Sequence, residues 1–254
     1  MIRVVNLKKA FNGQEVLRGV NLEVPKGEIT TIIGRSGGGK SVFLKHLVGL
    51  LKPDSGEIYV DGVDITKLKG SALDKVKRKF GMVFQGAALF DSLTVLDNLA
   101  FPLRELTDLG EGEILKMVTS ILERIGMAGM GDKYPDEISG GMKKRVGLAR
   151  VIIMSPEYIF FDEPTTGLDP IVEKSIHQLM MQCREMVQCT DIVVSHNVRE
   201  ILKISDHVAL LHEGRIIEVS SPEEIIRSEK PEVQEFFKTS VEGSRQLYRL
   251  RGWI

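Results

Sequence analysis

Hydrophobic and polar positions alternate in short runs over the first third of the chain, and this pattern predicts β-strands joined by turns. Residues 16–24 contain alternating stretches, and the Pro-Lys-Gly triplet at 25–27 is typical of a turn. Residues 28–33 are rich in β-branched side chains and predict a buried strand. Further strands are expected at 57–60 and 80–85, so this part of the chain is mainly β.

Helical spacing of apolar residues appears at 41–51 and dominates from about 94 to 155. We interpret the longer stretch as a helical subdomain inserted into an α/β core. Residues 158–163 are a continuous apolar run that ends in two acids, which is typical of a parallel strand covered on both faces. A helix is expected at 171–189, followed by a second buried strand at 191–195.

Two short apolar runs, 208–212 and 215–219, flank a Glu-Gly pair and predict a hairpin. Pro222 and Pro231 each stand where a short helix can begin. Residues from about 239 to 254 show no clear periodicity. The alternation of strands and helices therefore predicts an α/β fold.

Composition bounds the classes of protein that remain. The 254 residues are enough for one large α/β domain or a core with a subdomain. The net charge of -1 gives no general attraction to nucleic acid, so no nucleic-acid partner is expected. Cys183 and Cys189 are expected to be ordinary reduced thiols. No signal peptide and no apolar run of about 18 to 20 residues is present, so we expect any membrane role to act through a partner.

The segment from Gly34 to Ser41 fits the phosphate-binding pattern G-x-x-x-x-G-K-[S/T] without a mismatch. It lies between a predicted strand and a predicted helix, which is the context that the motif needs. Glycines let backbone N–H groups surround phosphate oxygens, and the helix N-terminus adds positive potential. Lys40 can reach the β- and γ-phosphates, and the Ser41 hydroxyl can bind Mg²⁺. The alternative, a flexible glycine turn, does not account for the strand, helix, lysine and serine together.

Asp162 and Glu163 end the apolar run at 158–163 and form a Walker B pattern. A strand end would place Asp162 beside the phosphate loop, where it can hold Mg²⁺ through water. Glu163 could polarise an attacking water molecule. The alternative is that these two carboxylates only face solvent at a strand end and have no part in a reaction.

Ser139, Gly140 and Gly141 precede a strong helix candidate and form a second anion-binding helix start. A simple helix N-cap would explain Ser139 equally well. The order of the motifs decides between them, because this one lies between a phosphate loop and a Walker B strand. Residues 138–142 resemble the LSGGQ signature of the ATP-binding cassette family, with Ile138 and Met142 as departures.

The resemblance covers nearly the whole chain and implies a RecA-like P-loop NTPase core with an antiparallel β subdomain and an inserted helical subdomain. It implies a nucleotide-binding domain over 1–240, with the helical subdomain at about 94–155, and a C-terminal extension over 241–254. It also implies ATP and Mg²⁺ as ligands. The residues that would bind ATP are Phe11, Gly34, Arg35, Ser36, Gly37, Gly38, Gly39, Lys40, Ser41, Val42, Ser139, Gly140, Gly141 and Asp169. Mg²⁺ would be held by Ser41, Gln85 and Asp162, and catalysis would use Glu163, His196 and Gln85.

Four of these residues owe their role to the resemblance. Phe11 stands where the family carries an aromatic that stacks on adenine, although it could be a core aromatic. Gln85 matches the Q-loop glutamine, and His196, after a predicted strand, matches the switch histidine that reaches the γ-phosphate. Asp169 lies in a D-loop-like segment, and it could equally be a helix N-cap ahead of Pro170.

The family's signature loop closes over ATP that is bound to a second nucleotide domain, so the resemblance implies a head-to-tail homodimer with two composite sites. Each ATP would lie between the phosphate loop of one chain and the signature residues of the other. The γ-phosphate would hold the pair together and hydrolysis would release it.

Residues 84–105, together with Met142, are similar to the ATPase subunit of the bacterial Mla (MCE-linked) phospholipid transporters. This similarity implies an integral-membrane permease, an MCE lipid-binding protein and often a STAS-domain subunit as partners. It places the chain peripherally at the cytoplasmic face of the inner membrane. Residues 86–105 would then bind a coupling helix of the permease. Leu89 and Phe90 would make apolar contacts with it, and Asp91 and Arg104 polar ones.

Three other functions share the core motifs: a cassette ATPase without a transporter, a regulatory protein with an inactive site, and the ATPase of a nutrient importer or drug exporter. The presence of Lys40, Asp162, Glu163 and His196 disfavours the inactive protein. The tail over 241–254 contains Trp253 and Tyr248, large aromatic side chains that are expected to pack against another surface. It could reach the partner ATPase or pack on its own domain.

Overall fold

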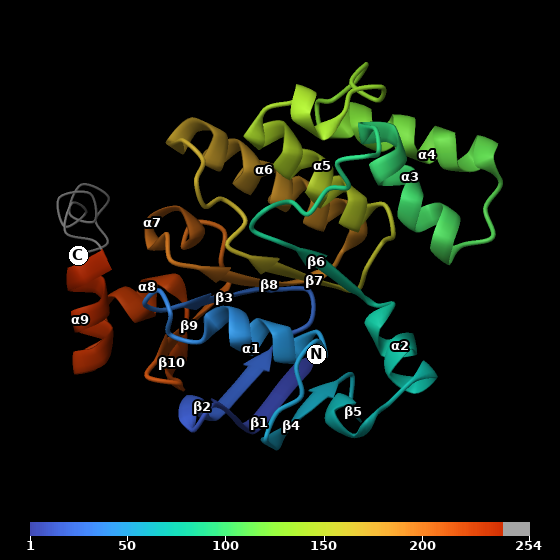
Figure 1. Cartoon of the computed structure of the whole chain (residues 1–254). Coiled ribbons are helices and arrows are strands. Elements are labelled where there is room, and N and C mark those ends of the chain that lie inside the picture. The colour runs from blue at the N-terminus through green and yellow to red at the C-terminus, as the bar shows by residue number, and fades with distance from the viewer. Residues whose placement is uncertain (241–254) are drawn as a thin grey trace. The chain divides into compact units, whose positions relative to one another are not determined.

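The computed structural model describes residues 1–240, so both interpretations of the tail over 241–254 concern residues outside the described part. The chain divides into two compact units. Figure 1 labels their helices and strands. Unit one contains residues 1–80 and the described chain from Cys189 onward. Unit two contains Gly81–Gln188.

Unit one contains an antiparallel sheet in the order β2-β1-β4-β5. Its strands are β1 (Ile2–Phe11), β2 (Gln14–Val24), β4 (Ser55–Val60) and β5 (Val63–Asp64). Side chains of β1 and β2 alternate over much of their length between buried and exposed, because successive residues of a strand point to opposite faces. The strands predicted at 16–24 and 57–60 are confirmed.

Four strands of a second sheet also lie in unit one, in the order β10-β9-β3-β8. Strand β3 (Ile29–Ile33) pairs in parallel with both β8 (Thr190–Ser195) and β9 (His207–His212). Strand β10 (Arg215–Ser220) pairs antiparallel with β9, which confirms the predicted hairpin. Every residue of β3 and β8 is buried, as expected of inner parallel strands.

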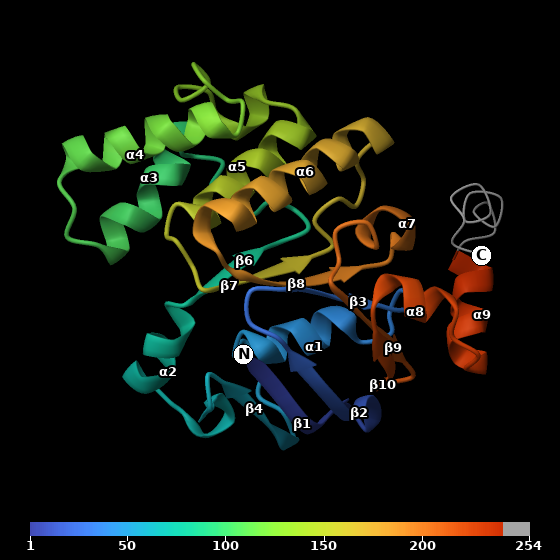
Figure 2. The same ribbon diagram turned by 180° about the vertical axis from the view of Figure 1, so that it is seen from behind.

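Helix α1 (Lys40–Leu47) lies between the antiparallel sheet and strand β3 in both views of unit one (Figures 1 and 2). Its apolar face consists of Phe43, Leu44 and Leu47, each with no solvent exposure. Complete burial of such a side chain stabilises the fold by roughly 1.5–3 kcal/mol. The helix that follows the phosphate loop is therefore held by its buried apolar face in the core of unit one.

Shorter elements complete unit one: the 3-10 helix η1 (Ile65–Lys67), α2 (Ser71–Lys77), α7 (Val198–Ile201), α8 (Pro222–Ile226) and α9 (Pro231–Ser240). Helices α8 and α9 begin at the two prolines, as predicted. Helix α2 was not predicted, and none of its residues is buried. The apolar periodicity that marks a helix is weak where no face packs on a core.

Unit two carries strand β6 (Phe80–Val83) from its second residue onward, strand β7 (Tyr158–Asp162) and most of the helices (Figure 2). Its helices are α3 (Val95–Leu106), α4 (Glu111–Arg124), η2 (Pro135–Glu137), α5 (Gly140–Ile152) and α6 (Pro170–Val187). The Thr94 hydroxyl caps α3 by accepting from the Asp97 amide. Arg104 then joins α3 to α4 by ion pairs with Asp97 and Glu111.

Both cysteines are buried and neither forms a disulfide: Cys183 and Cys189 are each 1% exposed. Among residues 1–240, none of the helices has the length and apolar character required to cross a bilayer.

Candidate functional site

The phosphate-binding loop has a backbone that only glycine permits at two of its positions. A Cβ on Gly34 would lie 2.3 Å from the carbonyl oxygen of Leu211 on β9. Gly39, which caps the N-terminus of α1, has a φ of 93°, a left-handed conformation that costs other residues energy. The glycines therefore fix the course of the loop from β3 into α1.

Lys40 lies against the backbone of this loop. Its Nζ donates hydrogen bonds to the carbonyl oxygens of Gly34, 3.0 Å away, and Arg35, 3.1 Å away. The side chain is only 5% exposed, whereas Arg35, Ser36 and Gly37 are exposed. A fixed positive charge thus lies beneath an open, glycine-rich surface at a helix N-terminus, which is an arrangement suited to a polyanion.

Strand register brings His196 to the same edge of the sheet as the phosphate loop. Ile33, the residue before Gly34, is paired with Ser195, the residue before His196. Adjacent strands are about 4.8 Å apart, so both chain segments leave the sheet side by side at its carboxyl edge. The His196 side chain is exposed there. Carboxyl edges of parallel strands are the usual place for ligands in such sheets.

Phe11 also belongs to unit one, at the end of β1. Its ring is 40% exposed, so it is not a core aromatic. The Lys9 ammonium lies 5.4 Å from the ring centroid and also forms an ion pair with Asp54 at 2.7 Å. An exposed ring face held in place by its strand is available for stacking on a flat ligand.

In unit two, strand β7 delivers the two predicted carboxylates. Tyr158 to Phe161 are buried, and the half-buried Asp162 and Glu163 follow them. Glu163 has a φ of 53°, which is uncommon outside glycine. The Thr166 hydroxyl donates to Glu163 Oε2 across 2.8 Å. The carboxylate is therefore held by the turn that follows it.

Asp169 acts as a helix N-cap, as one of the two interpretations of it expected. Its carboxylate accepts from the amides of Ile171 and Val172, each at 3.0 Å, at the start of α6. Nearby, the buried Thr165 hydroxyl donates to Glu173 at 3.0 Å. Residues 165–173 are thus fixed to the first turns of α6.

Ser139 caps α5 by accepting from the Met142 amide at 3.3 Å. Gly140 is exposed, while Gly141 packs against α6, because an added Cβ would lie 2.7 Å from Val172 Cγ1. The signature segment is thus the exposed start of a 13-residue helix.

Gln85 departs from the sequence-based expectation that it ends a strand. Strand β6 stops at Val83, and Gln85 is an exposed loop residue. The chain turns away at this point because Ala87 and Ala88 both adopt left-handed backbone conformations. The Gln85 carbonyl oxygen accepts a hydrogen bond from Lys144 of α5.

Sequence reasoning missed the side chains that hold these loops, namely Asn98, Lys144, Arg150 and Thr166. Burial lowers the pKa of Lys144 and of Arg150. Their inward position could have been suspected from the helical period of α5, since residues 144, 147 and 150 share one face.

The described residues do not gather three or more His, Cys, Asp or Glu side chains where they could hold a metal ion. The predicted Mg²⁺ donors are hydroxyl, amide and carboxylate oxygens, which are the donor types that Mg²⁺ prefers. Such an ion is commonly held by few protein groups together with substrate phosphates, so the donor set fits Mg²⁺.

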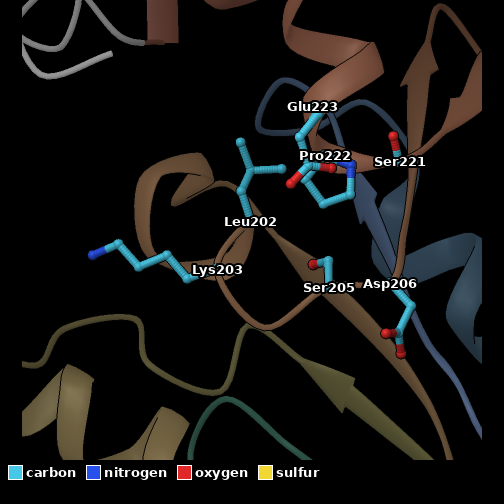
Figure 3. A pocket seen from close by; sticks show the side chains of 7 residues that line it. All are labelled: Leu202, Lys203, Ser205, Asp206, Ser221, Pro222 and Glu223. Carbon is cyan, nitrogen blue, oxygen red and sulfur yellow. The ribbon is translucent and has the colours of Figure 1, made fainter. Parts of the chain in front are cut away.

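A hollow of about 500 Å³ lies elsewhere in unit one, between the end of α7 and the start of α8 (Figure 3). Most of its polar side chains already have protein partners. Ser205 bonds to Thr31 at 2.7 Å, and Asp206 accepts from the Ile29 amide at 2.8 Å. Lys203 pairs with Glu200. This hollow offers few groups to a ligand.

Comparison with known sequences places residues 17–166 in a family described as ABC transporter. A probable ribonucleotide transport ATP-binding protein of Mycobacterium leprae is 40% identical over 92% of this chain and 68% of its own length. The intermembrane phospholipid transport system ATP-binding protein MlaF of Haemophilus influenzae is 40% identical over 96% of this chain and 92% of that protein. A methionine import ATP-binding protein, MetN of Carboxydothermus hydrogenoformans, is 41% identical over 86% of this chain and 65% of that protein.

Among solved structures, the dimeric post-hydrolysis state of the ATP-binding cassette MJ0796, bound to ADP and Pi, superposes with a TM-score of 0.79. It is 30% identical to this chain and covers 87% of it, while 99% of the cassette is matched. The fold is therefore the α/β fold of cassette ATPases, as predicted.

Proposed function

Since the chain belongs to the ABC transporter family and is an ATP-binding subunit with an ATPase fold, we propose that it hydrolyses ATP to move phospholipids at a bacterial inner membrane. The observation that carries the proposal is the match to the phospholipid transport protein MlaF, which extends over nearly all of both chains. The match to the methionine importer extends over a smaller part of that protein.

ATP binding begins at the phosphate loop. Lys40 and the loop amides of Gly34, Arg35, Ser36, Gly37, Gly38 and Gly39, with Ser41 and Val42 at the helix start, would hold the phosphates. The exposed ring of Phe11 would stack on adenine. His196 would reach the γ-phosphate from the strand next to the loop, which is supported by the register of Ile33 with Ser195.

Ser41, Asp162 and Gln85 would hold Mg²⁺, which neutralises charge on the β- and γ-phosphates when bound. Glu163 would orient and polarise the attacking water, with Gln85 and His196 as further contacts to the reacting groups. Such a reaction depends mostly on positioning and electrostatics. The restraint of Glu163 by Thr166 supports this role.

We propose that two copies bind two ATP molecules between them, with Ser139, Gly140, Gly141 and Asp169 of each copy closing on the phosphate loop of the other. The exposed position of Ser139 and Gly140 supports this arrangement. A related cassette is dimeric with ADP and Pi bound. Residues 1–240 would form this nucleotide-binding domain, with a helical subdomain at about 94–155, and residues 241–254 an extension.

The partners would be an integral-membrane permease, an MCE lipid-binding protein and a STAS-domain subunit, with the chain bound peripherally at the cytoplasmic face of the inner membrane. Residues 86–105 would receive the permease. Phe90 is 45% exposed and packs on Phe101, with ring centroids 5.0 Å apart, which supports an apolar contact there. The exposed Arg104 forms ion pairs with Asp97 and Glu111, which fix a charged group on this surface.

The test is a reconstitution of the chain with the membrane subunit that co-purifies with it, in proteoliposomes that contain fluorescent phospholipid. ATP should move the phospholipid between leaflets or to an acceptor protein. The matched control is Glu163→Gln, which should bind ATP, trap the dimer and abolish both hydrolysis and transport.

Methionine uptake in the same proteoliposomes would favour the second candidate, an importer ATPase, for which the MetN identity of 41% is the supporting observation. Normal ATP hydrolysis by Glu163→Gln would show that the role given to Glu163 is wrong. A chain that hydrolyses ATP and associates with no membrane subunit would instead be a cassette ATPase without a transporter.

A further inference from the structure

The loop over residues 84–93, named here the 84–93 loop, has a shape that its own sequence does not favour. Ala87 and Ala88 have φ values of 60° and 48°. A left-handed conformation costs an alanine roughly 1–2 kcal/mol, and here two follow each other. Such a backbone persists only where its surroundings fix it.

Helix α5 supplies one set of fixing contacts. Arg150 Nη2 donates to the carbonyl oxygens of Ala88, at 2.7 Å, and Ala87, at 3.2 Å. Lys144 donates to the carbonyl oxygen of Gln85. The Arg150 guanidinium also lies 5.6 Å from the centroid of the Phe90 ring. Two cations of one helix are thus directed at three neutral backbone acceptors in a single loop.

Asn98 of helix α3 supplies the other set. Its side chain has no solvent exposure. Oδ1 accepts from the Phe90 amide at 2.9 Å, while Nδ2 donates to the carbonyl oxygens of Phe90, at 3.0 Å, and Leu93, at 3.1 Å. Oδ1 also lies 3.4 Å from Arg150 Nη1, so the two sets of contacts meet. The loop is therefore held at both ends and in its middle.

Gly147 makes the close approach of loop and helix possible. It lies between Lys144 and Arg150 on the same face of α5. A Cβ at this position would lie 3.1 Å from both the Cβ and the carbonyl oxygen of Ala87. A side chain at position 147 would therefore crowd the 84–93 loop at Ala87.

The same helix begins at the signature segment, where Ser139 is its N-cap. Arg150 lies eleven residues further on, roughly 17 Å along the axis at 1.5 Å per residue. Helix α5 thus has the segment proposed to contact ATP at its N-terminus. Arg150, which donates to the 84–93 loop, lies near its C-terminus. Within this loop, Phe84 and Phe90 are 38% and 45% exposed.

We propose that Arg150 and Asn98 are positioning residues that fix the 84–93 loop to helix α5, so that pressure from a membrane partner on the loop alters the rate of ATP hydrolysis. This inference rests on the proposed function, because it needs a partner that contacts the loop. The inference names the residues that would connect a partner bound at the loop with helix α5, whose N-terminus carries the signature segment. Neither side chain is expected to touch ATP.

The test measures the ATPase activity of the chain alone and in complex with its membrane subunit, for wild type and three variants. Arg150→Lys keeps the charge but loses the fork of donors. Gly147→Ala places a Cβ 3.1 Å from Ala87 and replaces a glycine by a better helix former, and co-purification with the membrane subunit shows that the variant is folded. Arg145→Lys is the matched control, because Arg145 of the same helix donates to the carbonyl oxygen of Ile125 and not to the loop.

We expect Arg150→Lys and Gly147→Ala to keep KM for ATP and basal kcat within about 2-fold of wild type and to co-purify with the membrane subunit. The factor by which the membrane subunit raises kcat should fall at least about 5-fold in both variants. Arg145→Lys should keep the stimulation. Hydrogen exchange of the Phe90 amide should accelerate in the first two variants only. A residue with a merely structural role would not separate stimulated from basal kcat in this way.

Full stimulation in both Arg150→Lys and Gly147→Ala would overturn the inference and leave the proposed function in place. Unchanged exchange of the Phe90 amide in both variants would overturn it as well, in a measurement that needs no partner. If no membrane subunit co-purified with the wild-type chain, the proposed function would be wrong, and the inference that depends on it would be wrong as well.

Discussion

The hydroxyl of Thr166 donates a hydrogen bond to the carboxylate of Glu163, with 2.8 Å between Thr166 Oγ1 and Glu163 Oε2. Because Glu163 also has a φ of 53°, its side chain leaves the strand end in an unusual direction that the hydroxyl helps to hold. The turn is local, since the Thr166 amide also donates to the Glu163 carbonyl oxygen, at 3.3 Å.

We expect Thr166→Val to lower kcat about 10-fold with little change in KM for ATP, because a misdirected carboxylate orients water poorly. Thr166→Ser keeps the hydroxyl and should stay within about 2-fold of wild type. Steady-state ATP hydrolysis measures both. Equal kcat values for the valine and serine variants would show that the hydrogen bond has no part in turnover.

Replacement of Lys40 by alanine should weaken ATP binding by at least about 100-fold, because the charge beneath the phosphate loop is removed. Isothermal titration with ATP measures the loss. The control is Lys45→Ala, on the same helix but exposed to solvent. Comparable affinity in the two variants would contradict the position assigned to the phosphates.

Phe11→Ala should raise the Kd for ATP about 5- to 100-fold, since stacking of a base on an aromatic ring contributes about 1–3 kcal/mol. Phe11→Tyr should bind as wild type does. Inorganic tripolyphosphate lacks a base, so its Kd should not change in the alanine variant. A loss of tripolyphosphate binding would mean that Phe11 supports the loop and not the base.

Leu89→Asp combined with Phe90→Asp should abolish stimulation by the membrane subunit and recovery of the complex, because charge is placed in an apolar contact. Basal ATP hydrolysis should persist. Leu115→Asp is the control, since Leu115 of α4 is 39% exposed and lies outside the 86–105 surface. Unchanged complex formation and transport in the double variant would exclude this surface as the docking site.

Burial lowers the pKa of His46 from its ordinary value of 6.5, and the nearby Lys9 acts in the same direction. Contacts with the carbonyl groups of Val42 and Lys52 oppose this shift, as does Asp54. The unfolded chain therefore takes up a proton at a higher pH than the folded chain does. As the pH falls below about 6.5 towards the folded-state pKa, the free energy of unfolding should decrease.

The slope of that decrease approaches about 1.4 kcal/mol per pH unit where the two states differ by one proton. Urea unfolding between pH 5 and 8 measures it. His46→Gln keeps a donor for the Val42 carbonyl oxygen and should show a shallower pH dependence. An identical dependence in the variant would assign the effect to other groups.

Local sequence signals predicted much of the framework. The phosphate loop between β3 and α1 needed only β-branched residues, glycines and an apolar helix face, all of which act over a few residues. Pro222 and Pro231 marked helix starts because a proline fixes φ and lacks an amide donor. Asp169 capped its helix for a similarly local reason.

The 84–93 loop could not be predicted in the same way. A pair of alanines gives no turn signal, and their left-handed conformation is imposed by Arg150 from a helix about sixty residues further along the chain. Lys144 and Arg150 also resemble ordinary surface cations until the face of α5 that packs inward is known. Positions fixed by distant partners need the tertiary structure.

The burial of Cys183 and Cys189 has a practical use. Because both thiols are inaccessible in the native fold, the folded chain offers neither of them to a bulky maleimide dye. A cysteine introduced at Ile171, which is 83% exposed in the first turn of α6, would accept a single fluorophore without further engineering. Distances between labelled copies could then report opening and closing of the pair during turnover, beside the segment that Asp169 holds in place.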